Sequence, residues 1–163
     1  MTAPVLLIAI GNESRGDDAL GPLLLRQLQA QGLPQDVEAI EDFQLQVEHA
    51  ADLAGRERVL FVDAGMNTPA PYDFYRIDAG NAAPTFSHAI APQAVLATYT
   101  RIYDEAPPPA FVLCLRGERF ELGEALSPAA VRHLAAACKF AHALLQQTDA
   151  ADWQAHCTAT VRD

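Results

Sequence analysis

The chain has 163 residues, half of them apolar, and its formal net charge is −10. This length predicts one domain with a full hydrophobic core, and the acidic balance excludes binding to nucleic acid or to an anionic membrane through a basic face. No stretch approaches the roughly 20 apolar residues of a membrane span, and no signal peptide is recognisable. The three cysteines form no C-x-x-C pair and are odd in number, as expected of free thiols in a cytoplasmic protein.

Apolar periodicity predicts alternating strands and helices. The continuous apolar run from Val5 to Ile10 indicates a buried strand, and the leucines that follow at helical spacing indicate a helix that ends near Gly32. Further strands are expected at about 37–41, 58–63, 72–78 and 111–115, and further helices at about 45–53, 92–103 and from 128 onward, after Ser127 as N-cap. We therefore expect an α/β fold, a single-domain three-layer α/β/α sandwich with a mostly parallel, twisted five-stranded sheet. The domain is expected to occupy residues 1–147, followed by a C-terminal tail at 148–163.

The loop after the first strand carries two adjacent carboxylates, Asp17 and Asp18. Ligands of open α/β sheets bind just beyond the carboxyl ends of the strands, so acids at this place indicate chemistry, most simply a divalent metal. The glycines of the loop make no G-x-G-x-x-G fingerprint and no G-K-[ST] follows, so no nucleotide is expected. One aspartate is explained as the N-cap of the following helix. We assign that role to Asp17 and predict that Asp18 carries function.

Two more side chains are predicted to reach the same edge of the sheet. Asp63 ends the strand at 58–63, and His88 precedes the helix at 92–103. Together with Asp18 they would suit Ni²⁺, Zn²⁺ or another divalent ion with open positions. Taken singly, Asp63 is equally explained as a turn cap and His88 as a surface histidine. The sequence has no H-E-x-x-H and no G-x-S-x-G motif, which argues against a zincin and against a covalent serine nucleophile.

Several motifs together resemble those of the nickel–iron hydrogenase maturation endopeptidases, over about Val5 to Leu145. They are Ile10-Gly11-Asn12 with Asp17-Asp18-Ala19-Leu20-Gly21, Val62-Asp63-Ala64, Ser87-His88, and Gly123-Glu124-Ala125-Leu126-Ser127. The resemblance implies a small cytoplasmic protease that removes a C-terminal extension from the hydrogenase large subunit precursor after nickel insertion. It also implies that Asp18, Asp63 and His88 are both the catalytic and the metal-contacting residues, with the nickel contributed by the substrate.

The chain departs from the family pattern in two places. Relatives often carry glycines after the second strand, where this chain reads Glu41-Asp42-Phe43-Gln44, a segment that could line a cleft. Some relatives place the histidine beside a proline, where this chain has Pro92-Gln93, which makes His88 the better candidate.

The sequence leaves open both the mechanism of hydrolysis and two alternative functions. Hydrolysis could be metal-assisted, or of an aspartic type in which Asp18 or Asp63 acts as base. The same ligand set would also suit a nickel-recognition protein that docks on a hydrogenase precursor without cutting it. A divalent-metal hydrolase of a small molecule is a third possibility.

Overall fold

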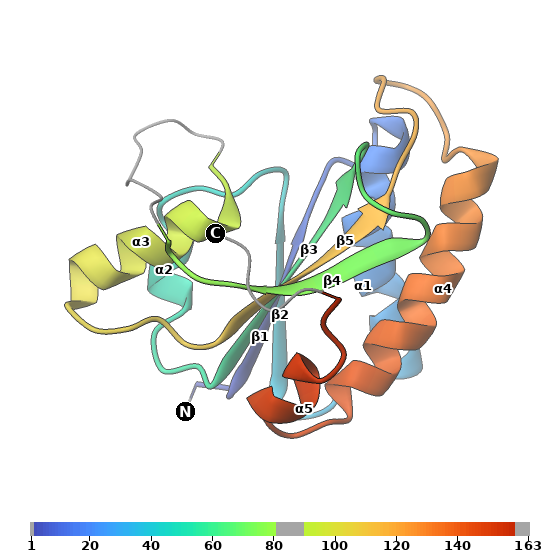
Figure 1. The fold of residues 1–163 in the computed structure, drawn as a ribbon. Coiled ribbons are helices and arrows are strands. Elements are labelled where there is room, and N and C mark those ends of the chain that lie inside the picture. The colour runs from blue at the N-terminus through green and yellow to red at the C-terminus, as the bar shows by residue number, and fades with distance from the viewer. Residues whose placement is uncertain (1, 81–89, 159–163) are drawn as a thin grey trace.

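The centre of the fold is a five-stranded sheet, seen in a computed structural model that describes residues 2–80 and 90–158 (Figure 1). Its strand order is β2-β1-β3-β5-β4, and only β4 runs antiparallel to its neighbour. The strands are β1 (Val5–Ile10), β2 (Val37–Asp42), β3 (Arg58–Gly65), β4 (Tyr72–Ile77) and β5 (Ala110–Arg116). The predicted fold class, a mostly parallel five-stranded α/β sandwich, is confirmed.

Helices cover both faces of the sheet and close a separate hydrophobic core on each (Figure 1). One face carries α1 (Leu20–Gln31), α4 (Pro128–Leu145) and α5 (Ala150–Gln154); the other carries α2 (His49–Asp52) and α3 (Pro92–Tyr103). The strands β1 and β3 are buried on both sides, which explains their continuous apolar sequence. The parallel strands end at one edge, hereafter the carboxyl edge, at the top of Figure 1.

Two helix predictions were wrong in detail. The expected helix at 45–53 is only one turn, α2, because the Gln46 N–H donates to His49 Nδ1 at 2.8 Å and forms a turn there instead. Helical spacing also places Val131 and Ile102 on the apolar faces of the helices predicted from 128 onward and at 92–103, yet their side chains are 55% and 60% exposed. Helical spacing defines a stripe, but the neighbouring elements decide how wide a stripe is covered.

The segment after α4 is tied to the sheet by Trp153. This side chain is fully buried, packs edge-on against Phe111 at a centroid distance of 5.3 Å, and lies under the Arg58 guanidinium. Its indole N–H donates to the Leu144 carbonyl at 3.0 Å. The weak sequence signal after residue 147 did not indicate this anchor.

We expect Trp153→Ala to destabilise the whole domain by about 3–5 kcal/mol, because it leaves a large cavity and removes the indole donor. Chemical denaturation followed by circular dichroism checks this, with the exposed neighbour Asp152→Ala as the matched control. An unchanged unfolding midpoint would mean that residues 148–163 are an independent tail.

Within the described residues, no helix has both the length and the apolar character needed to cross a membrane.

Candidate active site

The loop between β1 and α1 is shaped by two close backbone approaches. Gly11 has φ +148°, and a Cβ built on it would lie 2.0 Å from the Asp18 carbonyl oxygen. A Cβ on Gly21 would lie 2.4 Å from the Ile10 carbonyl oxygen. Only glycine fits at either position, so the loop can fold back across the ends of β1 and β3. A short 3₁₀ helix at Gly16–Ala19 then presents the two aspartates.

Asp17 does not cap α1, which corrects the sequence prediction. Its carboxylate is fully buried and accepts four hydrogen bonds from the loop at 117–127. The donors are the backbone N–H groups of Glu118, Arg119 and Ser127 and the hydroxyl of Ser127, at 2.7–3.1 Å. Burial by itself raises the pKa of Asp17, but these hydrogen bonds outweigh it, and the pKa is lowered. Asp17 is therefore a structural clamp between two distant loops.

Asp18 turns the other way, toward the end of β1. Its side chain is half-buried, and its Oδ2 accepts a hydrogen bond from the Asn12 backbone N–H at 2.9 Å. The Asp17 carboxylate is thus fully hydrogen-bonded within the fold. Among residues 2–80 and 90–158, the Asp18 carboxylate accepts from one backbone donor, and its other lone pairs are available to a ligand. That Asp18 carries the function of this loop stays a prediction.

Asp63 lies near the end of β3, beside Asp18. It is half-buried, and its Oδ1 accepts from the Ala64 N–H at 2.8 Å. Removal from water raises the pKa of Asp63 to about 7, and the negative charge of Asp18 adds to the rise. A carboxyl group whose pKa is raised toward neutrality beside a second carboxylate is typical of sites that carry out acid–base chemistry or bind a cation. The structure therefore brings together two of the three predicted residues.

The third predicted residue, His88, lies outside the described residues. The described chain resumes at Ile90, whose N–H donates to the Leu45 carbonyl at 3.4 Å, and leads directly into α3. The alternation along β3 puts Asp63 on the face that also holds Phe61, which is the face covered by α2 and α3. The assignment of His88 to the site stays a prediction.

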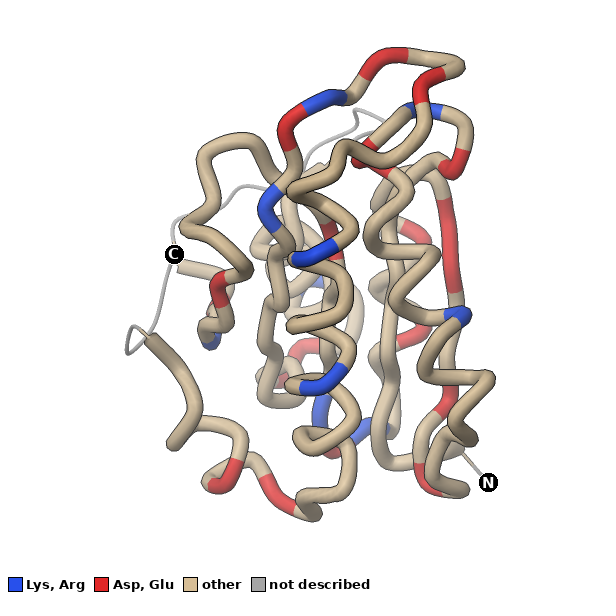
Figure 2. Tube along the Cα trace, turned by 90° about the vertical axis from the view of Figure 1, so that its right-hand side faces the viewer, with Lys and Arg blue, Asp and Glu red and all other residues tan. Residues whose placement is uncertain are grey.

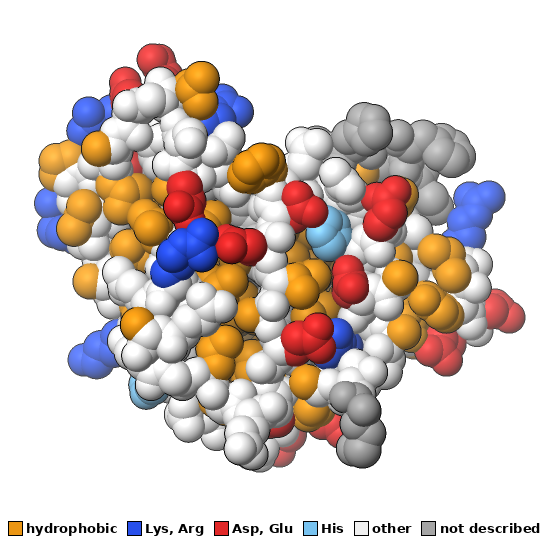
Figure 3. Space-filling view, turned by 180° about the vertical axis from the view of Figure 1, so that it is seen from behind, with side chains coloured by type: hydrophobic (Ala, Val, Ile, Leu, Met, Phe, Trp, Pro, Cys, Tyr) orange, Lys and Arg blue, Asp and Glu red, His pale blue; other side chains and the backbone are white. Residues whose placement is uncertain are grey.

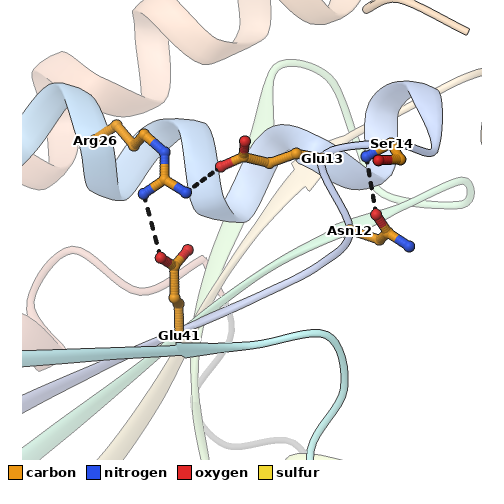
Figure 4. Close-up of polar contacts among 5 residues, drawn as sticks. All are labelled: Asn12, Glu13, Ser14, Arg26 and Glu41. Carbon is orange, nitrogen blue, oxygen red and sulfur yellow. Dashed lines mark hydrogen bonds and ion pairs between the residues drawn. The ribbon is translucent and has the colours of Figure 1, made fainter. Parts of the chain in front are cut away.

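A cleft of about 410 Å³ opens at the same edge of the sheet, between the loop after β1, helix α1 and the end of β2. One of its lining residues is Asn12, whose backbone N–H donates to Asp18. Arg26 of α1 crosses it and pairs with both Glu13 and Glu41, the latter at 3.2 Å (Figure 4). Asp42 and Phe43 form the rest of the β2 side. The expectation that the segment after the second strand lines a cleft is confirmed.

Two neighbours of the site were missed in the sequence. His49 is buried, with Nε2 3.4 Å from Asp42 Oδ2, so its partner lies on β2 and not one turn along its own helix. Cys114 is the register neighbour of Asp63 on β5, and its sulfur lies 3.0 Å from the Thr68 hydroxyl oxygen. Strand register places Cys114 and the contact of α2 with the end of β2 places His49, and no local sequence signal marks either position.

The described residues contain no group of three or more His, Cys, Asp or Glu side chains arranged to hold a metal ion. Asp18 and Asp63 supply two oxygen donors, which is less than the three or four protein ligands of a resident zinc site.

Comparison with solved structures identifies the fold. No protein-family model matches the chain, and no curated protein sequence matches it. The architecture is that of hydrogenase maturation proteases, small α/β proteins with the same overall arrangement.

Three solved structures illustrate the similarity. The hydrogenase maturating endopeptidase HybD from E. coli is 24% identical, with a TM-score of 0.67 over 87% of this chain and 91% of its own. The [NiFe] hydrogenase maturation protease HycI from Thermococcus kodakarensis is 19% identical, with a TM-score of 0.65 over 89% and 94%. The hydrogenase 2 maturation peptidase from a Thaumarchaeota archaeon is 20% identical, with a TM-score of 0.62 over 86% and 97%. At these identities the shared property is the fold.

Proposed function

We propose that this chain is a peptidase that removes the C-terminal extension of a nickel–iron hydrogenase large subunit precursor after nickel insertion. The observation that carries the proposal is the Asp18–Asp63 pair at the carboxyl edge, in which burial and mutual charge keep the pKa of Asp63 near neutrality. The proteins that share this fold over most of their length are named as maturation proteases, which supports a peptidase. We place the reaction in the cytoplasm, with the precursor as protein partner.

The proposed mechanism starts from the two carboxylates. Asp18 and Asp63, with His88 as third ligand, would complete the coordination of the nickel that the precursor already carries. Binding through one shared ion would fix the scissile peptide against the site and turn a loose encounter into an oriented one. A carboxyl group with a pKa near 7 can then take a proton from water and return it to the leaving amine at neutral pH. The nickel belongs to the substrate in this scheme.

Nickel dependence is the test that separates this mechanism from plain proteolysis. We expect the purified chain to shorten the nickel-loaded precursor. We expect it to leave metal-free precursor intact even at high enzyme concentration, because Asp18, Asp63 and His88 include no covalent nucleophile and a free peptide offers them little to bind. Mass spectrometry of the large subunit after incubation, with and without chelator, is the measurement. Cleavage of metal-free precursor in chelator would refute the role of nickel and leave the peptidase assignment standing.

The same measurement addresses the non-cleaving alternative. A nickel-recognition protein that only docks would bind the loaded precursor and produce no shortened product. Calorimetry of the free chain with Ni²⁺ adds an independent readout, since two carboxylates and one imidazole predict only weak binding. Nanomolar affinity of the free chain would favour a resident metal and thus a dedicated metal hydrolase.

A further inference from the structure

The exposed apolar side chains of this protein are unevenly placed. Six large hydrophobic side chains of the described residues are exposed, and three of them lie on loops that directly follow parallel strands. Phe43 follows β2 and is 72% exposed, Met66 follows β3 and is 57% exposed, and Leu122 lies in the loop after β5 and is 73% exposed. We call these three residues the apolar rim.

The apolar rim is too wide for a single small ligand. Its outer members follow β2 and β5, which are three strand spacings apart in the order β2-β1-β3-β5. At about 4.8 Å per spacing this separates them by roughly 14 Å along the edge, with the loops of β1 and β3 between them. Small-molecule sites enclose most of the ligand's surface, whereas these three side chains are more than half exposed and are spread along the edge. Figure 3 shows hydrophobic and acidic side chains exposed around a hollow at the top of the molecule.

Acidic side chains surround the apolar rim. On the loops at the carboxyl edge, exposed or half-buried acids outnumber bases, and Figure 2 shows them on the uppermost loops. The acids are Glu13, Asp42, Glu118, Glu121 and Glu124, against Arg15 and Arg119, and Glu13 is paired with Arg26 of α1. Such a surface opposes self-association through like charge and complements a partner with a basic border. Phe and Met are also the residue types enriched at the centre of protein interfaces.

We propose that the apolar rim is a docking surface for a folded protein whose complementary face has an apolar centre and a basic border. This inference rests on the proposed function, under which the docked protein is the nickel-loaded precursor itself. The enzyme then recognises the folded surface around the nickel as well as the ion. Docking on three loops at once would orient the precursor before the two aspartates reach its metal.

The test compares a rim variant with a matched control. Phe43→Ser, Met66→Ser and Leu122→Ser are combined in one chain, and Ile102→Ser, an equally exposed side chain near the end of α3, is the control. We expect the rim variant to raise KM for the nickel-loaded precursor at least about 30-fold, since buried apolar anchors dominate interface energies. Its kcat should change less than about twofold, because the aspartates are untouched, and the control should match the unmodified chain. Thermal melts confirm that both variants are folded.

Each outcome has a distinct meaning. An unchanged KM in the folded rim variant would overturn the docking surface and leave the proposed function intact. An unmodified chain that neither binds nor shortens the precursor would overturn both. A second copy of this chain is the competing occupant of the apolar rim, and sedimentation of the chain alone tests it. If the chain forms a dimer that the rim variant abolishes, and KM is unchanged, the apolar rim is a dimer interface and our proposal is refuted. Charge complementarity further requires that the association rate fall as salt rises.

Discussion

Asp63→Asn is expected to abolish processing and, at the same time, to make the free protein more stable at pH 8. Loss of a group that exchanges protons with the reacting water costs about 10²–10⁴-fold in rate, and the loss of a nickel contact adds to it. The amide keeps the shape of the side chain but can neither ionise nor act as base. Mass spectrometry of the precursor measures the first effect, and urea unfolding at several pH values measures the second.

The sign of the stability effect follows from the raised pKa. Between the ordinary aspartate value near 3.9 and the folded value of about 7, the native state holds a proton that the unfolded chain has lost, so stability falls as pH rises through this window. Above about pH 7 the full cost of a buried charge is present. Replacement by asparagine removes it, and we expect a gain of about 1–3 kcal/mol at pH 8 after allowing for partial exposure of the group.

The pH dependence of the free energy of unfolding provides the control for the Asp63→Asn prediction. At pH 4 Asp63 is protonated in the native state and about half protonated in the unfolded chain, so little of the pH-dependent loss has developed. Asp63→Asn and the unmodified protein should therefore have similar free energies of unfolding at this pH. Asp36→Asn, on the turn before β2 at the opposite end of the sheet, should show no gain that grows between pH 4 and pH 8. A destabilised Asp63→Asn variant at pH 8 would mean that the carboxylate is held by favourable contacts and that its elevated pKa is wrong.

Asp17→Ala is expected to cost about 3–5 kcal/mol of stability, a large part of the 5–15 kcal/mol typical of a domain. The substitution leaves three backbone N–H donors and the Ser127 hydroxyl without their buried acceptor. Because the pKa of Asp17 is lowered in the fold, its stabilisation is fully present above the unfolded-state value and is lost as pH falls below it. Urea unfolding at pH 7 and pH 3 measures both effects.

Substitutions at two residues next to Asp17 serve as comparisons for Asp17→Ala. Ser127→Ala removes one of the four donors and the N-cap of α4, where its Oγ accepts from the Ala130 N–H, so a smaller loss of about 1–2 kcal/mol is expected. Asp18→Ala should leave the fold intact and abolish processing. If Asp17→Ala were as stable as the unmodified chain, the clamp between the loop after β1 and the loop at 117–127 would not be a structural requirement.

The sequence by itself determined the architecture, because the relevant signals are local. Continuous apolar runs such as 5–10 and 59–62 are long enough to specify strands covered on both faces, and the four core leucines of α1 recur at helical spacing. Their alternation leaves a parallel α/β sandwich as the consistent solution. The positions of Asp18 and Asp63 follow from the same logic, since each comes at or just after the carboxyl end of a strand.

Only the tertiary structure decided what each polar residue does. Asp17 and Asp18 are adjacent and chemically identical, yet Asp17 is buried against a loop a hundred residues away, whereas Asp18 accepts from the Asn12 N–H and lies near Asp63. The proximity of Asp63 to Asp18, the Asp42–His49 pair and the place of Cys114 beside Asp63 likewise depend on strand order and register. Hydrogen-bond partners, burial and the resulting pKa are properties of contacts between distant segments, and these contacts form only when the sheet assembles.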